Sequence, residues 1–351
     1  MKIFSIVGAR PQFIKLAPLS AALAPFHEEI LVHTGQHYDY AMSGRMFRDL
    51  GIRNPDVHLE VQKDNSTVQV AEMILKLEKE MIRVAPDLVL VFGDTNSTLA
   101  GALAAEKCGV PLLHIEAGLR SFNRAMPEEL NRVTADHIAS YLFAPSPTAV
   151  SNLHKEGLTE NITLTGDIMV DTLHDNLEAA LQFSTMITQL GLKKNAYYLL
   201  TLHRNYNVDD AATLVHILSE LGKLEETIVF PMHPRTRKML HPNFEMPRNI
   251  LLTEPLGYLD FITLEYYAAK IITDSGGIQK EAYLLKKPCI TLRTETEWVE
   301  TVEEKWNLLL NPGAKDLVNP IREFSAPVRQ YPIFGNKVAA KMVEAINRIR
   351  L

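Results

Sequence analysis

Short apolar runs alternate with longer amphipathic segments along most of this chain. Each run is short enough for a buried strand, and each segment repeats its apolar residues at helical spacing. Strands that alternate with helices are typical of a parallel sheet covered by crossover helices, so the first half predicts an α/β unit. Its expected strands are 3–7, 30–34, 88–92, 112–115 and 141–144, and its expected helices are 13–23, 68–82 and 98–108.

The second half repeats this scheme. A helical, polar stretch at 166–195 separates the halves, so the pattern predicts two Rossmann-like doubly wound domains. The first is expected to comprise 1–168 with a returning segment, 335–351, and the second 169–334. Because such sheets bind ligands at the carboxyl ends of their strands, the two domains are expected to face a cleft. The expected strands are 197–202, 228–231, 250–253, 271–273 and 289–292, with helices near 211–221, 259–268 and 278–284 and a last one at 337–350.

Composition narrows the class of protein. Of 351 residues, 46% are hydrophobic and 22% charged, the balance of a globular protein with a substantial core. A net charge of −6 provides no basic field for nucleic acid or anionic membrane. No apolar stretch approaches the roughly 20 residues of a membrane helix, and Cys108 and Cys289 are too few for a disulfide framework. We therefore expect a cytoplasmic protein with reduced thiols.

Two cations follow the first expected strand. Gly8 permits a tight turn, Pro11 suits a first helical turn, and Arg10 and Lys15 would flank the helix N-terminus, a position that favours anions. The alternative is a solvated Arg and Lys on a loop. The G-x-G-x-x-G spacing of a dinucleotide site is absent, and the sequence has no H-x-x-x-H or H-E-x-x-H pattern for a metal.

Three carboxylates occur near the ends of later strands or at the start of a helix. Asp94 opens a helix, Glu116 follows a strand, and Glu128 lies in the first turn of a helix. The alternative explanations are a helix cap for Asp94 and the helix dipole for Glu128. Three acids converging on one sheet edge are also suited to proton transfer, because neighbouring carboxylates can take different roles as acceptor and donor.

In the second half, a strand leads into Ser275-Gly276-Gly277 and then a helix. Bare glycines let backbone N–H groups approach a pyrophosphate, and Glu281 is placed to accept hydrogen bonds from a ribose. A plain tight turn is the alternative. His203 also follows a strand, where it is either a structural histidine or a phosphate or acid–base group.

The whole chain resembles the non-hydrolysing UDP-N-acetylglucosamine 2-epimerases. The motifs that carry the resemblance are 8–15, 93–95, 114–120, 127–132, 201–204 and 273–281. The resemblance implies a glycosyltransferase-B type fold, usually a homodimer, and an isomerase without metal or nicotinamide. It implies a reaction in which the C2 proton is abstracted and UDP expelled to give 2-acetamidoglucal. UDP then returns as C2 is reprotonated on the opposite face, which interconverts UDP-GlcNAc and UDP-ManNAc for surface polysaccharide.

The resemblance also implies roles for the site residues. Asp94, Glu116 and Glu128 are the acid–base candidates, while His203 and Arg10, with Lys15 nearby, would stabilise the departing diphosphate. The remaining ligand contacts implied are Ser275, Gly276 and Gly277 to phosphate, Glu281 to ribose and Phe261 to uracil.

One departure from the family pattern bears on the substrate. Many members have Thr-Glu-Arg-Pro-Glu where this chain has Trp298 in the arginine position, although Arg293 remains. The variant resembles the subgroup that acts on UDP-2,3-diacetamido-2,3-dideoxyglucuronate, whose carboxylate would need a cation such as Arg124, Arg132 or Arg293. That sugar, a glycosyltransferase of the same fold and a non-catalytic sensor of nucleotide sugars remain the alternatives.

Overall fold

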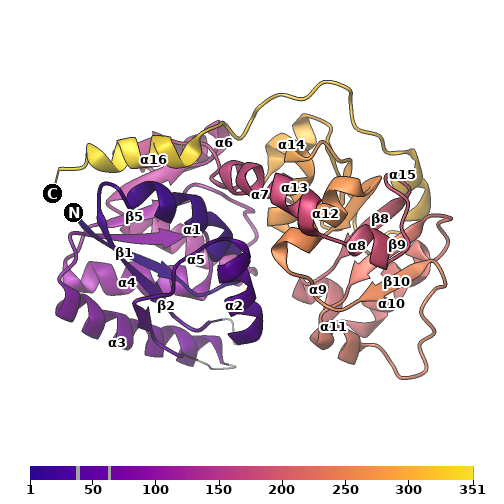
Figure 1. Ribbon diagram of the computed structural model, residues 1–351, viewed down its shortest axis with the longest axis horizontal. Helices are drawn as coiled ribbons and strands as arrows, with labels where there is room; N and C mark the ends of the chain where they lie inside the picture. Colours follow the sequence, from indigo (N-terminus) through magenta and orange to yellow (C-terminus); the bar gives the residue numbers. More distant parts are fainter. Residues whose placement is uncertain (37–39, 62–64, 351) are drawn as a thin grey trace. The chain divides into compact units, whose positions relative to one another are not determined.

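A computed structural model describes residues 1–36, 40–61 and 65–350, which fold as two compact units (Figure 1). Unit 1 comprises Met1–Asp175 and Pro332–Leu351, and unit 2 comprises Asn176–Tyr331. The first boundary lies inside helix α7 (Met169–Phe183), whereas the sequence suggested a boundary just ahead of it. A continuous helix gives no turn signal at such a boundary.

Unit 1 is built on a seven-stranded parallel sheet of order β3-β2-β1-β4-β5-β6-β7. Its strands are β1 (Lys2–Val7), β2 (Glu28–His33), β3 (Val57–His58), β4 (Leu88–Phe92), β5 (Leu112–Ile115), β6 (Tyr141–Ala144) and β7 (Ile162–Leu164). Its helices, besides the start of α7, are α1 (Arg10–Leu23), α2 (Tyr40–Asp49), α3 (Ser66–Val84), α4 (Asn96–Cys108), α5 (Pro127–Ile138), α6 (Pro147–Lys155) and α16 (Val338–Asn347).

The helices of unit 1 cover both faces of its sheet. Helices α3, α4 and α5 pack in succession on one face, and the C-terminal helix α16 lies against α1 on the other (Figure 1). The backbone N–H of Ala339 in α16 donates a hydrogen bond to Asp171 Oδ2 in α7 at 2.7 Å. The central strands β1 and β4 are almost entirely buried, as expected for a parallel sheet covered on both faces.

Unit 2 is built on a six-stranded parallel sheet of order β10-β9-β8-β11-β12-β13. Its strands are β8 (Tyr197–Thr201), β9 (Thr227–Pro231), β10 (Ile250–Thr253), β11 (Lys270–Thr273), β12 (Cys289–Thr291) and β13 (Asn307–Leu309). Its helices, besides the end of α7, are α8 (Met186–Gln189), α9 (Asn205–Val208), α10 (Ala211–Leu221), α11 (Pro234–Met239), α12 (Tyr258–Tyr267), α13 (Gly276–Leu284), α14 (Val299–Glu303) and α15 (Val318–Glu323).

The predicted fold class is confirmed: both units are parallel α/β sheets with helices on their faces. Every predicted strand is present, with ends shifted by no more than two residues. The sequence missed three short edge strands, β3, β7 and β13. Within the described ranges, no helix is long and apolar enough to cross a membrane.

Candidate functional site

The first group of candidate residues gathers at the carboxyl ends of β1, β4 and β5 in unit 1. The turn after β1 requires glycine, because a β-carbon on Gly8 would lie 1.9 Å from Thr34 Oγ1 and 2.3 Å from Ser97 Oγ. The side chain of Gln12 fixes this turn to the end of β4. Its Oε1 accepts a hydrogen bond from the N–H of Gly8 at 2.8 Å, and its Nε2 donates to the carbonyl of Phe92 at 3.0 Å. The start of α1, which carries Arg10, is thereby held beside the loop that carries Asp94.

Lys15 and Glu116 form a largely buried ion pair at this edge, with side-chain exposures of 7% and 9%. Gly93 lies directly against them. A β-carbon on Gly93 would stand 2.9 Å from Lys15 Nζ and 3.0 Å from Glu116 Oε2. Gly93 has φ +62° and Glu116 itself has φ +74°, which is uncommon for a non-glycine residue and recurs at active sites. The structure thus brings one predicted anion-binding cation against one predicted acid–base carboxylate.

Asp94 is paired with Arg132, the cation predicted to contact substrate. Nη2 of the buried Arg132 donates to Asp94 Oδ2, and the Asn131 side chain donates to the Asp94 carbonyl at 2.9 Å. Nη1 of Arg132 donates to Glu129 at 2.9 Å. Glu129 was not predicted as a site residue, although it follows Glu128 in the same motif.

A buried polar chain supports these loops from below. His114 Nε2 lies 2.7 Å from the carbonyl oxygen of Gly93, and His114 Nδ1 lies 2.6 Å from Asp136 Oδ1. Asp136 Oδ2 accepts hydrogen bonds from the Gly118 N–H at 3.0 Å and from Arg120 at 2.7 Å. Burial alone would raise the pKa of Asp136, but His114 and Arg120 together hold it below its usual value. The carboxylate therefore remains charged and fixes the Gly93 turn through His114.

Glu128 and Arg10 are placed by the starts of their helices. Glu128 is half-buried in the first turn of α5, and Arg10 is half-buried as the first residue of α1. The ion pairs described above, Asp94 with Arg132 and Glu116 with Lys15, thus bring two of the three predicted acid–base carboxylates against predicted cations.

The second group lies at the carboxyl ends of β8, β11 and β12 in unit 2. Asp274, directly after β11, is fully buried and holds the turn after β8. It accepts hydrogen bonds from the backbone N–H groups of His203 and Arg204 and from the Asn207 side chain, all at 3.0 Å. His203 Nδ1 lies 3.0 Å from Asp274 Oδ1, while the His203 ring is about half exposed. Burial alone would raise the pKa of Asp274, but His203 and these hydrogen bonds lower it.

The sequence did not identify Asp274 as functional, although it lies inside the Thr273–Glu281 motif. Its adjacency to Ser275 was the available signal. The structure shows that Asp274 is the group that anchors His203.

The predicted phosphate loop begins α13, and the packing of the protein itself also requires one of its glycines. A β-carbon on Gly276 would lie 2.5 Å from Glu297 Oε1 and 3.4 Å from Trp298 Nε1. Gly276 therefore makes room for these protein side chains, a reason for glycine that the sequence did not predict. Ser275 precedes it as the N-cap residue without a side-chain capping bond.

The remaining candidates of unit 2 are buried around this loop. Arg293 is fully buried, with Nη1 2.9 Å from Glu297 Oε2, and Arg204 Nη2 lies 3.8 Å from Glu297 Oε1. Glu281 in α13 is 4% exposed and Phe261 in α12 is 7% exposed. Burial and ion pairing thus restrict the positions of these side chains.

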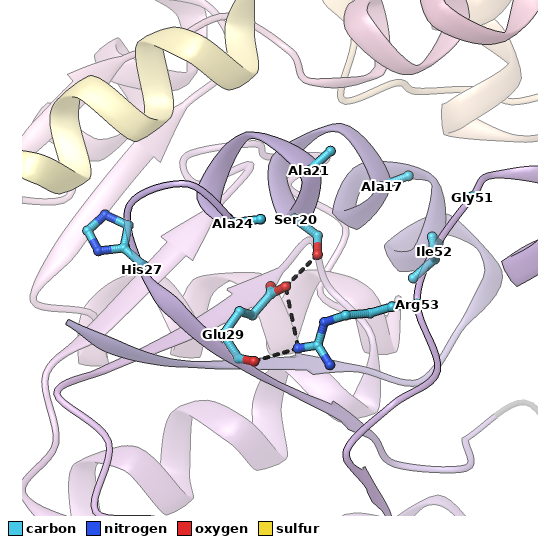
Figure 2. Close-up of a pocket in the computed structure, with 9 residues that line it drawn as sticks. All are labelled: Ala17, Ser20, Ala21, Ala24, His27, Glu29, Gly51, Ile52 and Arg53. Atoms are coloured by element: carbon cyan, nitrogen blue, oxygen red, sulfur yellow. Dashed lines mark hydrogen bonds and ion pairs between the residues drawn. The ribbon is translucent and has the colours of Figure 1, made fainter.

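A cavity of about 270 Å³ lies within unit 1, and Figure 2 shows the residues that line it. It is lined by Ala17, Ser20, Ala21, Ala24, His27, Glu29, Gly51, Ile52 and Arg53. Glu29 lies near the amino end of β2, and its carboxylate accepts hydrogen bonds from Ser5 and Ser20. The cavity is therefore not at the carboxyl edge of the sheet. Across the described part of the chain, no three His, Cys, Asp or Glu residues are grouped to hold a metal.

Comparison with known proteins decides the family. The family model described as UDP-N-acetylglucosamine 2-epimerase matches residues 22–347. The chain belongs to this family. Its members are epimerases and hence isomerases, so the resemblance seen in the sequence motifs is confirmed.

Relatives and solved structures extend the match over the full chain. A UDP-N-acetylglucosamine 2-epimerase homolog of Methanococcus maripaludis is 45% identical over 99% of this chain and 100% of its own. The UDP-2,3-diacetamido-2,3-dideoxy-D-glucuronate 2-epimerase of Pseudomonas aeruginosa is 42% identical over 91% of this chain and 90% of its own. The crystal structure of Methanocaldococcus jannaschii UDP-GlcNAc 2-epimerase with UDP-GlcNAc and UDP has a TM-score of 0.93, at 39% identity over 99% of both chains.

Proposed function

We propose that this chain interconverts UDP-GlcNAc and UDP-ManNAc by eliminating UDP and adding it back to 2-acetamidoglucal. The observation that carries the proposal is the pair of cation-bound carboxylates, Asp94 with Arg132 and Glu116 with Lys15, at the carboxyl edge of the unit 1 sheet. The named activity of the M. jannaschii relative, 41% identical over 99% of this chain, supports the same substrate.

The chemistry requires a base and a stabilised leaving group together. The C2 hydrogen is not adjacent to a carbonyl, so its removal as a proton must accompany departure of the diphosphate. The proton passes to a carboxylate, the C1–O bond breaks with its electron pair on UDP, and a C1–C2 double bond forms. Return of a proton to the other face of C2 and of UDP to C1 gives the epimer. We assign proton transfer to Asp94, Glu116 and Glu128.

We propose that UDP binds to unit 2 and that unit 1 supplies the acid–base groups. These are the roles expected from the sequence, with the acid–base residues in 1–168 and 335–351 and the UDP-binding residues in 169–334. Ser275, Gly276 and Gly277 would hold phosphate, Glu281 the ribose and Phe261 the uracil. His203, anchored by Asp274, would stabilise the departing diphosphate with Arg10 and Lys15, and Arg293 would add a further cation. The reaction as written needs no metal or nicotinamide.

Proton NMR in heavy water tests this function. Incubation with UDP-GlcNAc is expected to place deuterium at C2 and to form UDP-ManNAc, and EDTA is expected to leave both unchanged. Release of glucal and UDP during long incubation would support the elimination step, which a simple glycosyltransferase has no reason to perform. Tight UDP binding without C2 exchange would reject the epimerase and favour a transferase or a sensor.

Two observations favour an alternative substrate, UDP-2,3-diacetamido-2,3-dideoxyglucuronate. Trp298 stands beside the α13 loop where many family members have arginine, and a P. aeruginosa relative named for the diacetamido uronate is 42% identical. The same NMR experiment with that nucleotide sugar would decide between them, because the true substrate should exchange at the higher kcat/KM.

We also propose a homodimer, formed through the outer face of α3. Val68, Leu75 and Ile82 recur every seven residues along this helix and are 49%, 67% and 72% exposed. The opposite face of α3 buries Met73, Leu77 and Met81 in the core. An apolar stripe of heptad spacing suits packing against the same helix of a second copy.

Finally, we propose that the enzyme works in the cytoplasm and supplies ManNAc-type sugar for surface polysaccharide. Both cysteines are free thiols, and burial raises the pKa of the Cys289 thiol to about 12. Reduced thiols are typical of cytoplasmic proteins.

A further inference from the structure

Phe122 combines two features that a surface residue rarely shows together. Its side chain is 72% exposed, and its backbone has φ +59°, in the left-handed region. A bulky residue in this region is an outlier, because its β-carbon crowds the backbone. Both features cost free energy relative to a polar residue or a glycine at this position.

A buried carboxylate imposes this conformation. Glu129, 4% exposed, accepts hydrogen bonds at Oε2 from the N–H of Ser121 at 3.0 Å and from its hydroxyl at 2.9 Å. Its Oε1 accepts one from the N–H of Phe122 at 2.9 Å. The backbone N–H groups of Ser121 and Phe122 are therefore fixed, and the Phe122 side chain is exposed.

The Glu129 carboxylate also connects Phe122 to Asp94, one of the three acid–base candidates. Glu129 Oε2 also accepts a hydrogen bond from Arg132 Nη1 at 2.9 Å, and the other guanidinium nitrogen, Nη2, donates to Asp94. A chain of two buried side chains thus joins the loop of Phe122 to Asp94. Strained residues of this kind cluster at active sites and ligand clamps.

We propose that the ring of Phe122 packs against the 2-acetamido sugar of the substrate and contributes to its binding. This inference rests on the proposed function. A pyranose presents C–H groups and the acetamido group presents a methyl, and an exposed aromatic ring on a fixed backbone packs well against both. The proposal gives Phe122 a role in binding the sugar only and no role in binding uridine or the diphosphate.

Phe122→Gly separates the ring from the backbone conformation, because glycine takes positive φ without strain. In this variant and in F122A, KM for UDP-GlcNAc is expected to rise about tenfold while kcat changes less than about twofold. The Kd for UDP, which lacks the sugar, is expected to stay at the wild-type value. F122W should retain a KM near that of the wild type.

Phe26→Ala is the matched control, since Phe26 is a 62% exposed phenylalanine of the same unit outside this loop. An unchanged KM in F122G, with wild-type turnover intact, would overturn the assignment of Phe122 and leave the proposed function standing. A parallel loss of UDP affinity in F122G would also overturn it. Absence of turnover in the wild-type protein would instead reject the proposed function itself.

Discussion

The ammonium of Lys280 lies 4.1 Å from the centroid of the Trp298 indole ring. Both side chains are buried, with exposures of 1% and 2%. A cation over the face of an indole is attracted by the electron density of the ring, and burial strengthens that attraction. Trp298 is therefore coupled to its neighbour in α13.

Replacing Trp298 with arginine should destabilise the protein. In Trp298→Arg a guanidinium would face Lys280 in a buried setting, so the free energy of unfolding is expected to fall by about 3 kcal/mol. Adding Lys280→Glu should recover part of this loss by supplying an opposite charge. Chemical denaturation of the two single variants and the double variant would measure the coupling, and strictly additive effects would contradict it.

Gly276→Ala should weaken UDP binding, because its β-carbon would fall 2.5 Å from Glu297 Oε1. The clash would displace the Glu297 side chain, which pairs with Arg293, a cation proposed to contact the diphosphate. A loss of about 1–3 kcal/mol in stability is expected from the overpacking. Calorimetric titration with UDP and thermal unfolding would measure both. Gly44→Ala in α2 is the control, since its nearest neighbour is the end of the Arg48 side chain at 3.9 Å. Equal behaviour of the two variants would contradict the crowding of Gly276 by Glu297.

Asp274→Asn should remove part of the acid dependence of stability. The folded-state pKa of Asp274 is lowered, so its contribution is present above the unfolded pKa and is lost as pH falls through the folded value. The variant should be less stable by about 1–3 kcal/mol at pH 7, because its amide would face N–H donors, and the difference should shrink in acid. Urea unfolding between pH 7 and pH 3 would measure this, with the exposed Asp175→Asn as control. A difference independent of pH would argue against a charged Asp274.

Glu128→Gln should remove most of the turnover while UDP still binds. The substitution keeps the shape and removes the proton-transfer group, so kcat is expected to fall by about 10²–10⁴-fold. Steady-state epimerisation and UDP titration would measure the two effects separately, with the exposed Glu106→Gln as control. Retained turnover would remove Glu128 from the chemistry.

Leu75→Glu should convert the proposed dimer into a monomer, because it places charge at the centre of the apolar stripe of α3. Sedimentation velocity at micromolar concentration would measure the assembly. Phe183→Glu, at a 68% exposed position in α7, should leave the assembly unchanged. A monomeric wild-type protein would reject the dimer.

The sequence predicted the central strands because they are continuous apolar runs buried on both faces. The edge strands β3, β7 and β13 span only two or three residues, too few for any periodicity to appear. Residues at strand ends, such as Asp94 and His203, were predictable because a parallel sheet collects them at one edge. Glu129 and Asp274 were not, since their importance comes from hydrogen bonds to residues that only the folded chain brings close. Gly276 shows a further limit, because a glycine pattern reveals crowding without revealing which atoms cause it.

Helix α16, formed by residues near the end of the chain, packs against α1, which begins at Arg10. Unit 2 is a continuous stretch of chain, whereas unit 1 needs both termini. During synthesis, unit 2 can therefore complete its core before unit 1 can. The sheet of unit 1 is therefore left with one side of α1 uncovered until α16 has been synthesised.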